Sequence, residues 1–258
     1  ALSSSWQEMT GQKSFPIYFI TASPPQMEEK IMEKLILDGI QPFGCFFKDN
    51  LKNLRPSRLW RLTQQIGYKL QALLQLRLRL HENVRQIMWG DDSESDAIIY
   101  SIYSDVCARR LSHKELEHIL RSLRVVGEQT EIILSLQEKI PSRDPVEKIY
   151  INLAIDTDPE YYLKFGRRVV PTENTFQAAL DLFQDRRINF EQLTRVAQDM
   201  ILNYGFTMEE LEVSIDNMIR RQRLGAPCVD QLLPLLKQEE LITEHFKPSM
   251  APAAVKDK

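Results

Sequence analysis

The first half of the chain alternates short apolar runs with longer segments of helical periodicity. Three runs rich in β-branched and aromatic residues are predicted to be strands: 15–20, 40–47 and 84–89. Helices are predicted to follow them at about 24–37, 57–80 and 97–106. Such alternation is typical of parallel strands joined by right-handed crossovers. The sequence therefore predicts an α/β fold in which the three strands share one Rossmann-like parallel sheet.

Local signals indicate where the first helix begins and ends. The strand at 15–20 is followed by Thr21, and Ser23 is a good N-cap with Pro24 as the first helical residue. Gly39 is predicted to stop that helix.

The second half of the chain is predicted to be mainly helical. Two helices are expected within 111–140, and a further strand-like run lies at 146–155. Four more helices are predicted after residue 172, at 175–184, 190–204, 208–222 and 229–239. We expect an α/β core over 1–110, a helical connector over 111–145, a mainly helical region over 146–248 and a disordered tail over 249–258.

Composition excludes several classes of protein. With 258 residues, 43% of them hydrophobic, the chain is long enough for one large core or two smaller ones. A net charge of −3 gives no electrostatic reason to expect nucleic acid as a partner. The three cysteines form no CxxC pair, which favours a reducing, cytoplasmic location over a disulfide framework or a zinc site. No apolar run approaches the roughly 20 residues that span a bilayer.

A carboxylate-rich loop follows the third predicted strand. Trp89 and Gly90 lead into Asp91 and Asp92, and Glu94 and Asp96 come shortly after. Adjacent carboxylates repel one another unless a cation neutralises them, and hard oxygen ligands suit Mg²⁺. A solvated acidic turn is the ordinary alternative. The position at a strand end, where open α/β sheets place their ligands, favours a Mg²⁺ site.

Three features of this half form an ordered set. Thr21 supplies a hydroxyl at a strand end, Lys69 supplies an ammonium group on a helix, and Asp91 and Asp96 supply carboxylates after another strand. Phosphoryl transfer to an aspartate uses such a set: the hydroxyl and the ammonium hold phosphoryl oxygens, and the carboxylates hold Mg²⁺.

At these residues the chain resembles the haloacid dehalogenase superfamily of phosphohydrolases. The strand end YFIT at 18–21 matches its second motif, Lys69 its third, and Gly90-Asp91 with Asp96 its fourth. Within the superfamily, the segments TASP at 21–24 and GDDSESDAIIYSIY at 90–103 look most like the actin-patch-associated phosphatidate phosphatase family. The resemblance covers about residues 15 to 110.

The resemblance implies a Mg²⁺-dependent phosphohydrolase. Thr21 and Lys69 would contact the phosphate, and Asp91, Asp92 and Asp96 would bind Mg²⁺. The substrate would be a phosphorylated small molecule or a lipid phosphate.

The chain departs from the superfamily at the first motif. That motif is an Asp-x-Asp at the end of a first strand, which lies between the strands ending at Thr21 and Trp89, and residues 1–16 contain no aspartate. Either a segment upstream of Ala1 belongs to the protein, as the missing initiator Met also indicates, or the strand comes from elsewhere. We therefore expect this chain alone to be inactive. The alternative is a non-catalytic relative that serves as an interaction module.

Two later segments offer weaker alternatives. Asp156 and Asp158 follow an apolar run and would serve as a first motif in a circularly permuted sheet, whereas the commoner interpretation of Asp158-Pro159 is a helix N-cap. The segment 161–168 (YYLKFGRR) could line a substrate or phosphate site, but a structural role, with the arginine stems packed on the aromatic rings, is more frequent for such segments.

Overall fold

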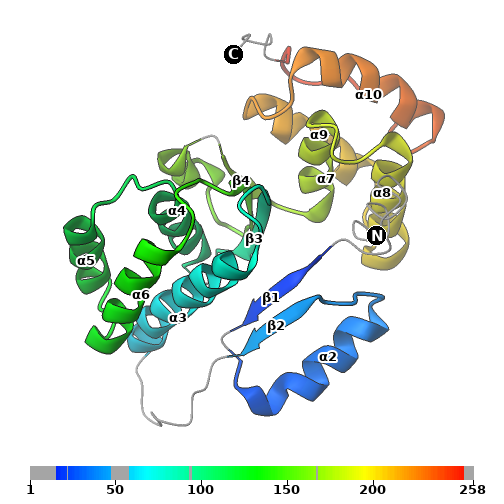
Figure 1. The fold of residues 1–258 in the computed structure, drawn as a ribbon. Coiled ribbons are helices and arrows are strands. Elements are labelled where there is room, and N and C mark those ends of the chain that lie inside the picture. The colour runs from blue at the N-terminus through cyan, green and yellow to red at the C-terminus, as the bar shows by residue number, and fades with distance from the viewer. Residues whose placement is uncertain (1–15, 22, 48–57, 93–94, 167, 253–258) are drawn as a thin grey trace. The chain divides into compact units, whose positions relative to one another are not determined.

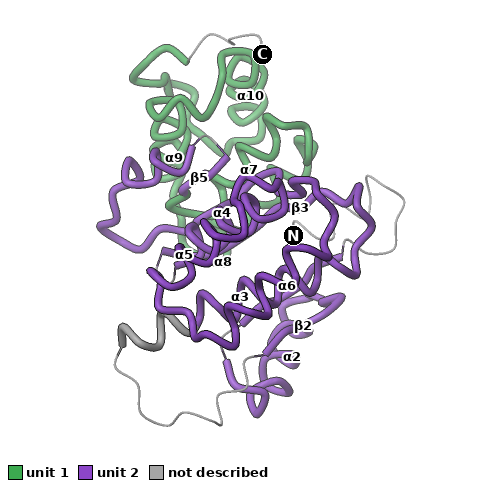
Figure 2. Tube along the Cα trace, turned by 60° about the vertical axis from the view of Figure 1, so that its left-hand side comes forward, with its two compact units in different colours: residues 1–15, 172–258 green, residues 16–171 purple. Residues whose placement is uncertain are grey.

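The computed structural model describes residues 16–21, 23–47, 58–92, 95–166 and 168–252, with the side chains of 58–64 left aside. These residues belong to two compact units (Figure 2): one spans residues 16–171, and the other contains the chain from Thr172 onward. Each unit is described by itself.

The first unit is α/β (Figure 1). Its elements, in chain order, are β1 (Tyr18–Thr21), η1 (Pro25–Met27), α2 (Glu28–Leu37), β2 (Gly44–Phe47), α3 (Arg58–Arg79), β3 (Gln86–Asp91), α4 (Asp96–Cys107), α5 (His113–Ser122), α6 (Gly127–Lys139), β4 (Val146–Asn152), η2 (Pro159–Phe165) and β5 (Val169–Thr172), whose last residue begins the second unit.

The strands form two small sheets. β1 pairs in parallel with β2, so that Thr21 lies opposite Phe47. The other sheet has the order β3-β4-β5, and β3 pairs in parallel with β4. In that register Asp91 lies opposite Asn152, which brings the carboxyl ends of β3 and β4 to one edge.

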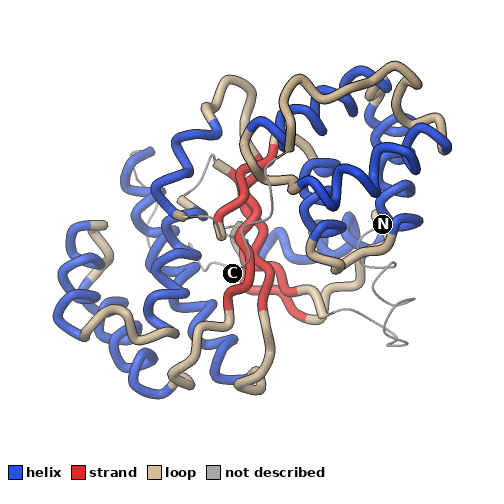
Figure 3. The backbone as a smooth tube through the Cα atoms, turned by 90° about the horizontal axis from the view of Figure 1, so that it is seen from above, coloured by secondary structure: helices blue, strands red, loops and turns tan. Residues whose placement is uncertain are grey.

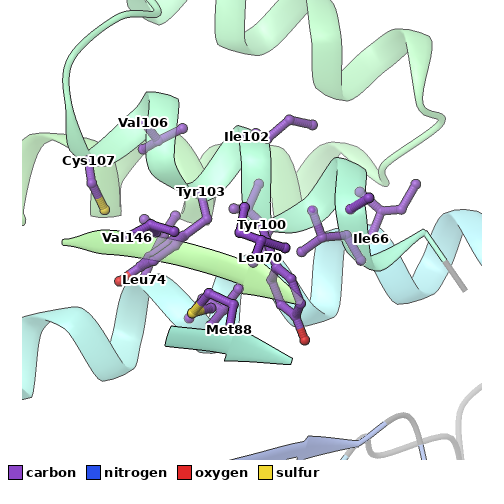
Figure 4. Close-up of a cluster of buried hydrophobic side chains, with 14 of the residues drawn as sticks. Ile66, Leu70, Leu74, Met88, Tyr100, Ile102, Tyr103, Val106, Cys107 and Val146 are labelled. Carbon is purple, nitrogen blue, oxygen red and sulfur yellow. The ribbon is translucent and has the colours of Figure 1, made fainter. Parts of the chain in front are cut away.

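The core of this unit lies where α3, α4 and α6 pack around β3 and β4. Side chains from both strands and from the helices meet there (Figure 4), among them Leu70, Met88, Tyr103 and Val146. Their burial supplies the main driving force for this packing. Ile20 of β1 packs against the same cluster, so both sheets share one core.

Helix α3 also contacts α6 closely. A Cβ at Gly67 would lie 2.8 Å from Cδ of Gln129 in α6 and 2.8 Å from Cγ1 of Val125, which lies just before that helix; both distances are closer than real Cβ contacts allow. Gly67 is therefore required by space at this crossing, since a larger residue would push the helices apart.

The second unit is helical (Figure 3): its described elements after β5 are α7 (Thr175–Gln184), α8 (Phe190–Tyr204), α9 (Met208–Arg220) and α10 (Ala226–Gln238). Three of them begin with a side-chain cap, from Asn174, Asn189 and Thr207 respectively. Each such cap is worth about 1 kcal/mol because it satisfies a backbone N–H that the helix leaves unpaired. The buried side chains of this unit include Phe176, Leu193, Leu211, Ile215, Leu232 and Leu236.

Two of the three cysteines are buried, one in each unit. Cys107 ends α4 and is fully buried, and Cys228 lies in α10 with 9% of its surface exposed. Burial is the main reason that the pKa of Cys107 rises to about 12 and that of Cys228 to about 11.

The α/β class and the predicted strands and helices are confirmed, but the single sheet is wrong for the described strands. The runs at 15–20 and 40–47 form one sheet, and the run at 84–89 belongs to another. Each of β1 and β3 has one hydrogen-bonded neighbour, and no described strand joins them.

The start of the first helix also differs from the prediction. Ser23 does not cap it, because its backbone N–H donates to Oγ1 of Thr21 and its hydroxyl accepts from the same oxygen. Pro24 takes the N-cap position of η1 without a side-chain cap. Gly39 does follow the end of α2, with φ of 73°, as the glycine stop predicts.

The compact units divide the chain at residue 171, whereas the boundaries predicted for this part of the chain lie at 110 and 145. The reason is β4: because it pairs with β3, the segment between them, with α5 and α6, belongs to the α/β unit. The tail predicted to be disordered begins at residue 249, and its last six residues lie outside the described part of the chain.

Candidate functional site

The carboxyl edge of β3 brings together three of the predicted residues. Lys69 comes from α3, Asp91 ends β3, and Asp96 is the first residue of α4. Lys69 Nζ lies 2.6 Å from Oδ1 of Asp96, and both residues are only 4% exposed. In such a buried ion pair each charge compensates the other away from water. The positive end of the α4 dipole further favours the charged form of Asp96.

Asp96 also contacts the strand end. Its Oδ2 accepts a long hydrogen bond, 3.4 Å, from the backbone N–H of Asp91. A Cβ on Gly90 would lie 2.5 Å from Cβ of Asp96, so the carboxylate side chain packs directly on the glycine. At the end of β3, Gly90 is therefore required because a side chain there would clash with Asp96, whereas the role predicted for Asp91 is chemical, that of a carboxylate at a strand end.

Tyr100 fastens α4 to β3 one turn later. Its hydroxyl donates to the carbonyl of Trp89 over 2.9 Å. Trp89 itself is 46% exposed and packs on Tyr150 of β4, with 4.5 Å between ring centroids. The strand end and the first turn of α4 are thus fixed relative to each other.

Asp92 faces the residues that follow β4. Its Oδ2 accepts from the backbone N–H of Ala154, at 2.9 Å, and from the hydroxyl of Thr157. Its own N–H donates to the carbonyl of Asn152. Asp92 therefore links the tips of β3 and β4.

Tyr162, which the sequence singled out only as part of the segment 161–168, lies beside these carboxylates. It is 5% exposed, and burial, with smaller contributions from Asp92, Tyr161 and Asp91, raises its pKa to about 12. The hydroxyl therefore remains protonated at neutral pH. Only tertiary structure brings Tyr162 here, since no local pattern distinguishes it from Tyr161.

Thr21 makes local contacts. Its hydroxyl donates to Oγ of Ser23 over 3.0 Å, and the described contacts do not join it to Lys69, Asp91 or Asp96. Its place in a common site stays a prediction.

The metal ligands likewise stay a prediction. Among the described residues, which exclude Glu94, no group of three or more His, Cys, Asp or Glu side chains is arranged to hold a metal ion. Asp91 is exposed at the strand end. Asp96 forms an ion pair with Lys69, and Asp92 accepts hydrogen bonds from the residues after β4. One exposed carboxylate fits Mg²⁺, which usually keeps several waters and takes one or two protein carboxylates.

The later alternatives have structural roles. Asp158 caps η2 by accepting from the N–H of Glu160, with Pro159 in the first turn, which is the N-cap interpretation of this segment. Lys164 Nζ lies 3.3 Å from the centroid of the Tyr161 ring, so in this segment a lysine packs on an aromatic face, where the sequence predicts arginine stems.

Comparison of the chain with protein-family models, with curated proteins and with solved structures finds no match. Among the described helices, none is long and apolar enough to cross a membrane.

Proposed function

We propose that the α/β unit belongs to a Mg²⁺-dependent phosphohydrolase of the haloacid dehalogenase type. The observation that carries the proposal is the buried Lys69–Asp96 pair, at the strand edge where Asp91 is exposed. A buried lysine fixed by one carboxylate is well placed to neutralise the oxygens of a phosphate ester. The substrate would be a phosphorylated small molecule or a lipid phosphate, and the location cytoplasmic.

In this proposal each residue has a separate task. Asp91 would hold Mg²⁺, which supplies charge neutralisation for the phosphoryl oxygens. Asp96 holds Lys69 in place, and Thr21 would contact the phosphate. The attacking aspartate would come from a strand outside the described residues. Among the described strands β1 and β3 each have one hydrogen-bonded neighbour, so each has an edge with which such a strand could pair.

Mg²⁺ binding tests the carboxylate assignment in the 258-residue chain. We expect weak binding, followed by backbone amide shifts in NMR at the end of β3. Asp91→Asn should abolish it, and Asp156→Asn, which alters a carboxylate of the permuted alternative, should leave it unchanged. The unmodified chain should not hydrolyse p-nitrophenyl phosphate, because the nucleophile is absent.

Other outcomes identify the alternatives. Turnover by the chain that survives Asp91→Asn but is lost in Asp156→Asn would favour the permuted site. A chain that binds neither Mg²⁺ nor inorganic phosphate would favour the non-catalytic interaction module.

A further inference from the structure

The segment that follows β4 lies at the same edge of the sheet as Asp91, and specific contacts hold it there. Residues 153–166, here called the edge loop, run from the end of β4 through η2. Several of its apolar side chains face solvent: Ile155 is 93% exposed, Leu163 64% and Tyr161 55%. Solvent-facing apolar groups do not hold a loop in position, so other contacts must.

One of these contacts is made by Asp92. A single carboxylate oxygen, Oδ2, accepts from both the Ala154 amide and the Thr157 hydroxyl. These two donors lie at the two ends of one turn, because the N–H of Thr157 also donates to the carbonyl of Ala154 over 3.2 Å. Asp92 therefore binds the whole turn and not one end of it.

The backbone of that turn has an uncommon conformation. Asp156 has φ of 75°, in the left-handed region that non-glycine residues other than Asn and Asp rarely adopt. Such a conformation persists only where the surrounding contacts fix it. The two hydrogen bonds to Asp92 are contacts of this kind.

The far end of the edge loop is held by packing. Tyr162 is buried against the core cluster and lies 6.0 Å from the ring of Phe165, centroid to centroid. The loop is thus attached by Leu153 and Asp92 at its start, and by Tyr162 and Phe165 in η2.

We propose that Asp92 is a positioning residue that docks the edge loop on the tip of β3, and that it is not a Mg²⁺ ligand. In this role it sets the place of Tyr162 beside Asp91. The relevance to catalysis rests on the function proposed above, whereas the docking itself does not. The two adjacent aspartates thus have different roles: Asp91 would bind Mg²⁺, and Asp92 would hold the edge loop in place.

Hydrogen exchange of the Ala154 amide tests the docking. Asp92→Ala removes the acceptor and should accelerate exchange about tenfold, as expected for the loss of one hydrogen bond. Asp92→Asn keeps an oxygen acceptor without the charge and should restore exchange to within about twofold of the original chain. Equal exchange in Asp92→Ala and the original chain, or no rescue by Asp92→Asn, would overturn the proposal.

A second pair of variants serves if Asp92→Ala does not fold. Thr157→Val removes one donor with little change in shape and should accelerate exchange across 153–158, whereas Thr157→Ser keeps the hydroxyl and should not. Identical exchange in these two variants would also contradict the docking.

Mg²⁺ titration separates docking from metal binding. Asp92→Asn should leave the Mg²⁺ affinity of the chain within about twofold, since one carboxylate with waters suffices for Mg²⁺. A loss as large as that caused by Asp91→Asn would show that Asp92 is a ligand and overturn the proposal. If the original chain binds no Mg²⁺, the proposed function fails, while the exchange experiment still decides the docking.

Discussion

Gly90 is the residue on which the geometry of the strand end depends. Its φ is not in the left-handed region, so its requirement comes from space and not from backbone conformation. The added Cβ would meet both Cβ and Oδ2 of Asp96 at 2.5 Å. Asp96 has little freedom to retreat, because Lys69 holds its carboxylate.

We expect Gly90→Ala to lower the free energy of unfolding by about 1–3 kcal/mol, the usual cost of overpacking a filled site. Gly127→Ala is the matched control: its Cβ would meet nothing within 4 Å, at the first residue of α6. It should raise stability by about 0.5–1 kcal/mol. Urea denaturation measures both, and equal effects of the two substitutions would contradict the steric explanation.

The sequence predicted part of this site because its residues carry recognisable local signals. Gly90 and Asp91 end an apolar run, and Asp96 begins the next helix. The pairing of Lys69 with Asp96 spans 27 residues, and that of Asp92 with Thr157 spans 65. Such contacts depend on how elements pack, so the docking role of Asp92 was not predictable from the loop itself.

At the scale of elements, Asp144 links the ends of several helices and strands near the N-terminal end of β4. Its carboxylate accepts from Ser104 of α4 at 2.8 Å, from Arg110 at 2.7 Å and from Arg168 at 2.6 Å. It also accepts from the N–H of Val146, the first residue of β4. One carboxylate thus ties α4, β4 and the residue before β5.

This network makes the stability of the α/β unit depend on pH. Burial raises the pKa of Asp144, but hydrogen bonds from Arg110, Ser104 and Arg168 outweigh it and hold the pKa below its usual range. A carboxyl whose pKa is lower in the folded chain binds its proton more readily when unfolded. Its stabilising contribution is therefore complete above the unfolded value, about 3.9, and is lost as pH falls through the folded pKa.

Asp144→Asn should accordingly lower stability by roughly 1–2 kcal/mol near neutral pH. The difference between the two chains should shrink as the pH falls below about 4, because the original chain then loses the charge as well. Chemical denaturation at a series of pH values measures this. A difference that stays constant down to about pH 2 would show that the charge of Asp144 is irrelevant.

The type of most elements was predictable, and their partners were not. Apolar runs of β-branched and aromatic residues were predicted as strands and are strands, since that signal is local. β5 has only four residues, with Pro171 among them, and escaped prediction. The pairing of β3 with β4 joins residues 60 or 61 positions apart and has no local signal, and neither has the division of β1 and β3 between two sheets.

At the scale of the whole molecule, the division into units follows from that same pairing. The apolar run at 146–155 was assigned to a mainly helical second half, because most segments after it are helices. Its pairing with β3 instead brings α5 and α6 into the α/β unit. The helices from α7 onward have buried apolar side chains of their own, which a chain of this length and composition can supply.

The two buried cysteines make the opening of each unit separately measurable. Only a thiolate reacts with iodoacetamide at a useful rate, and the raised pKa values keep Cys107 and Cys228 as thiols while folded. Alkylation of each should therefore proceed through transient opening, at a rate set by the local free energy of exposure. Mass spectrometry measures the alkylation rate of each cysteine. Different rates under native conditions would show that the two units open independently. Rates that stay equal as mild denaturant is added would show that both units open in one cooperative transition. Without any introduced cysteine, the chain then reports on the α/β unit through one sulfur and on the helical unit through the other.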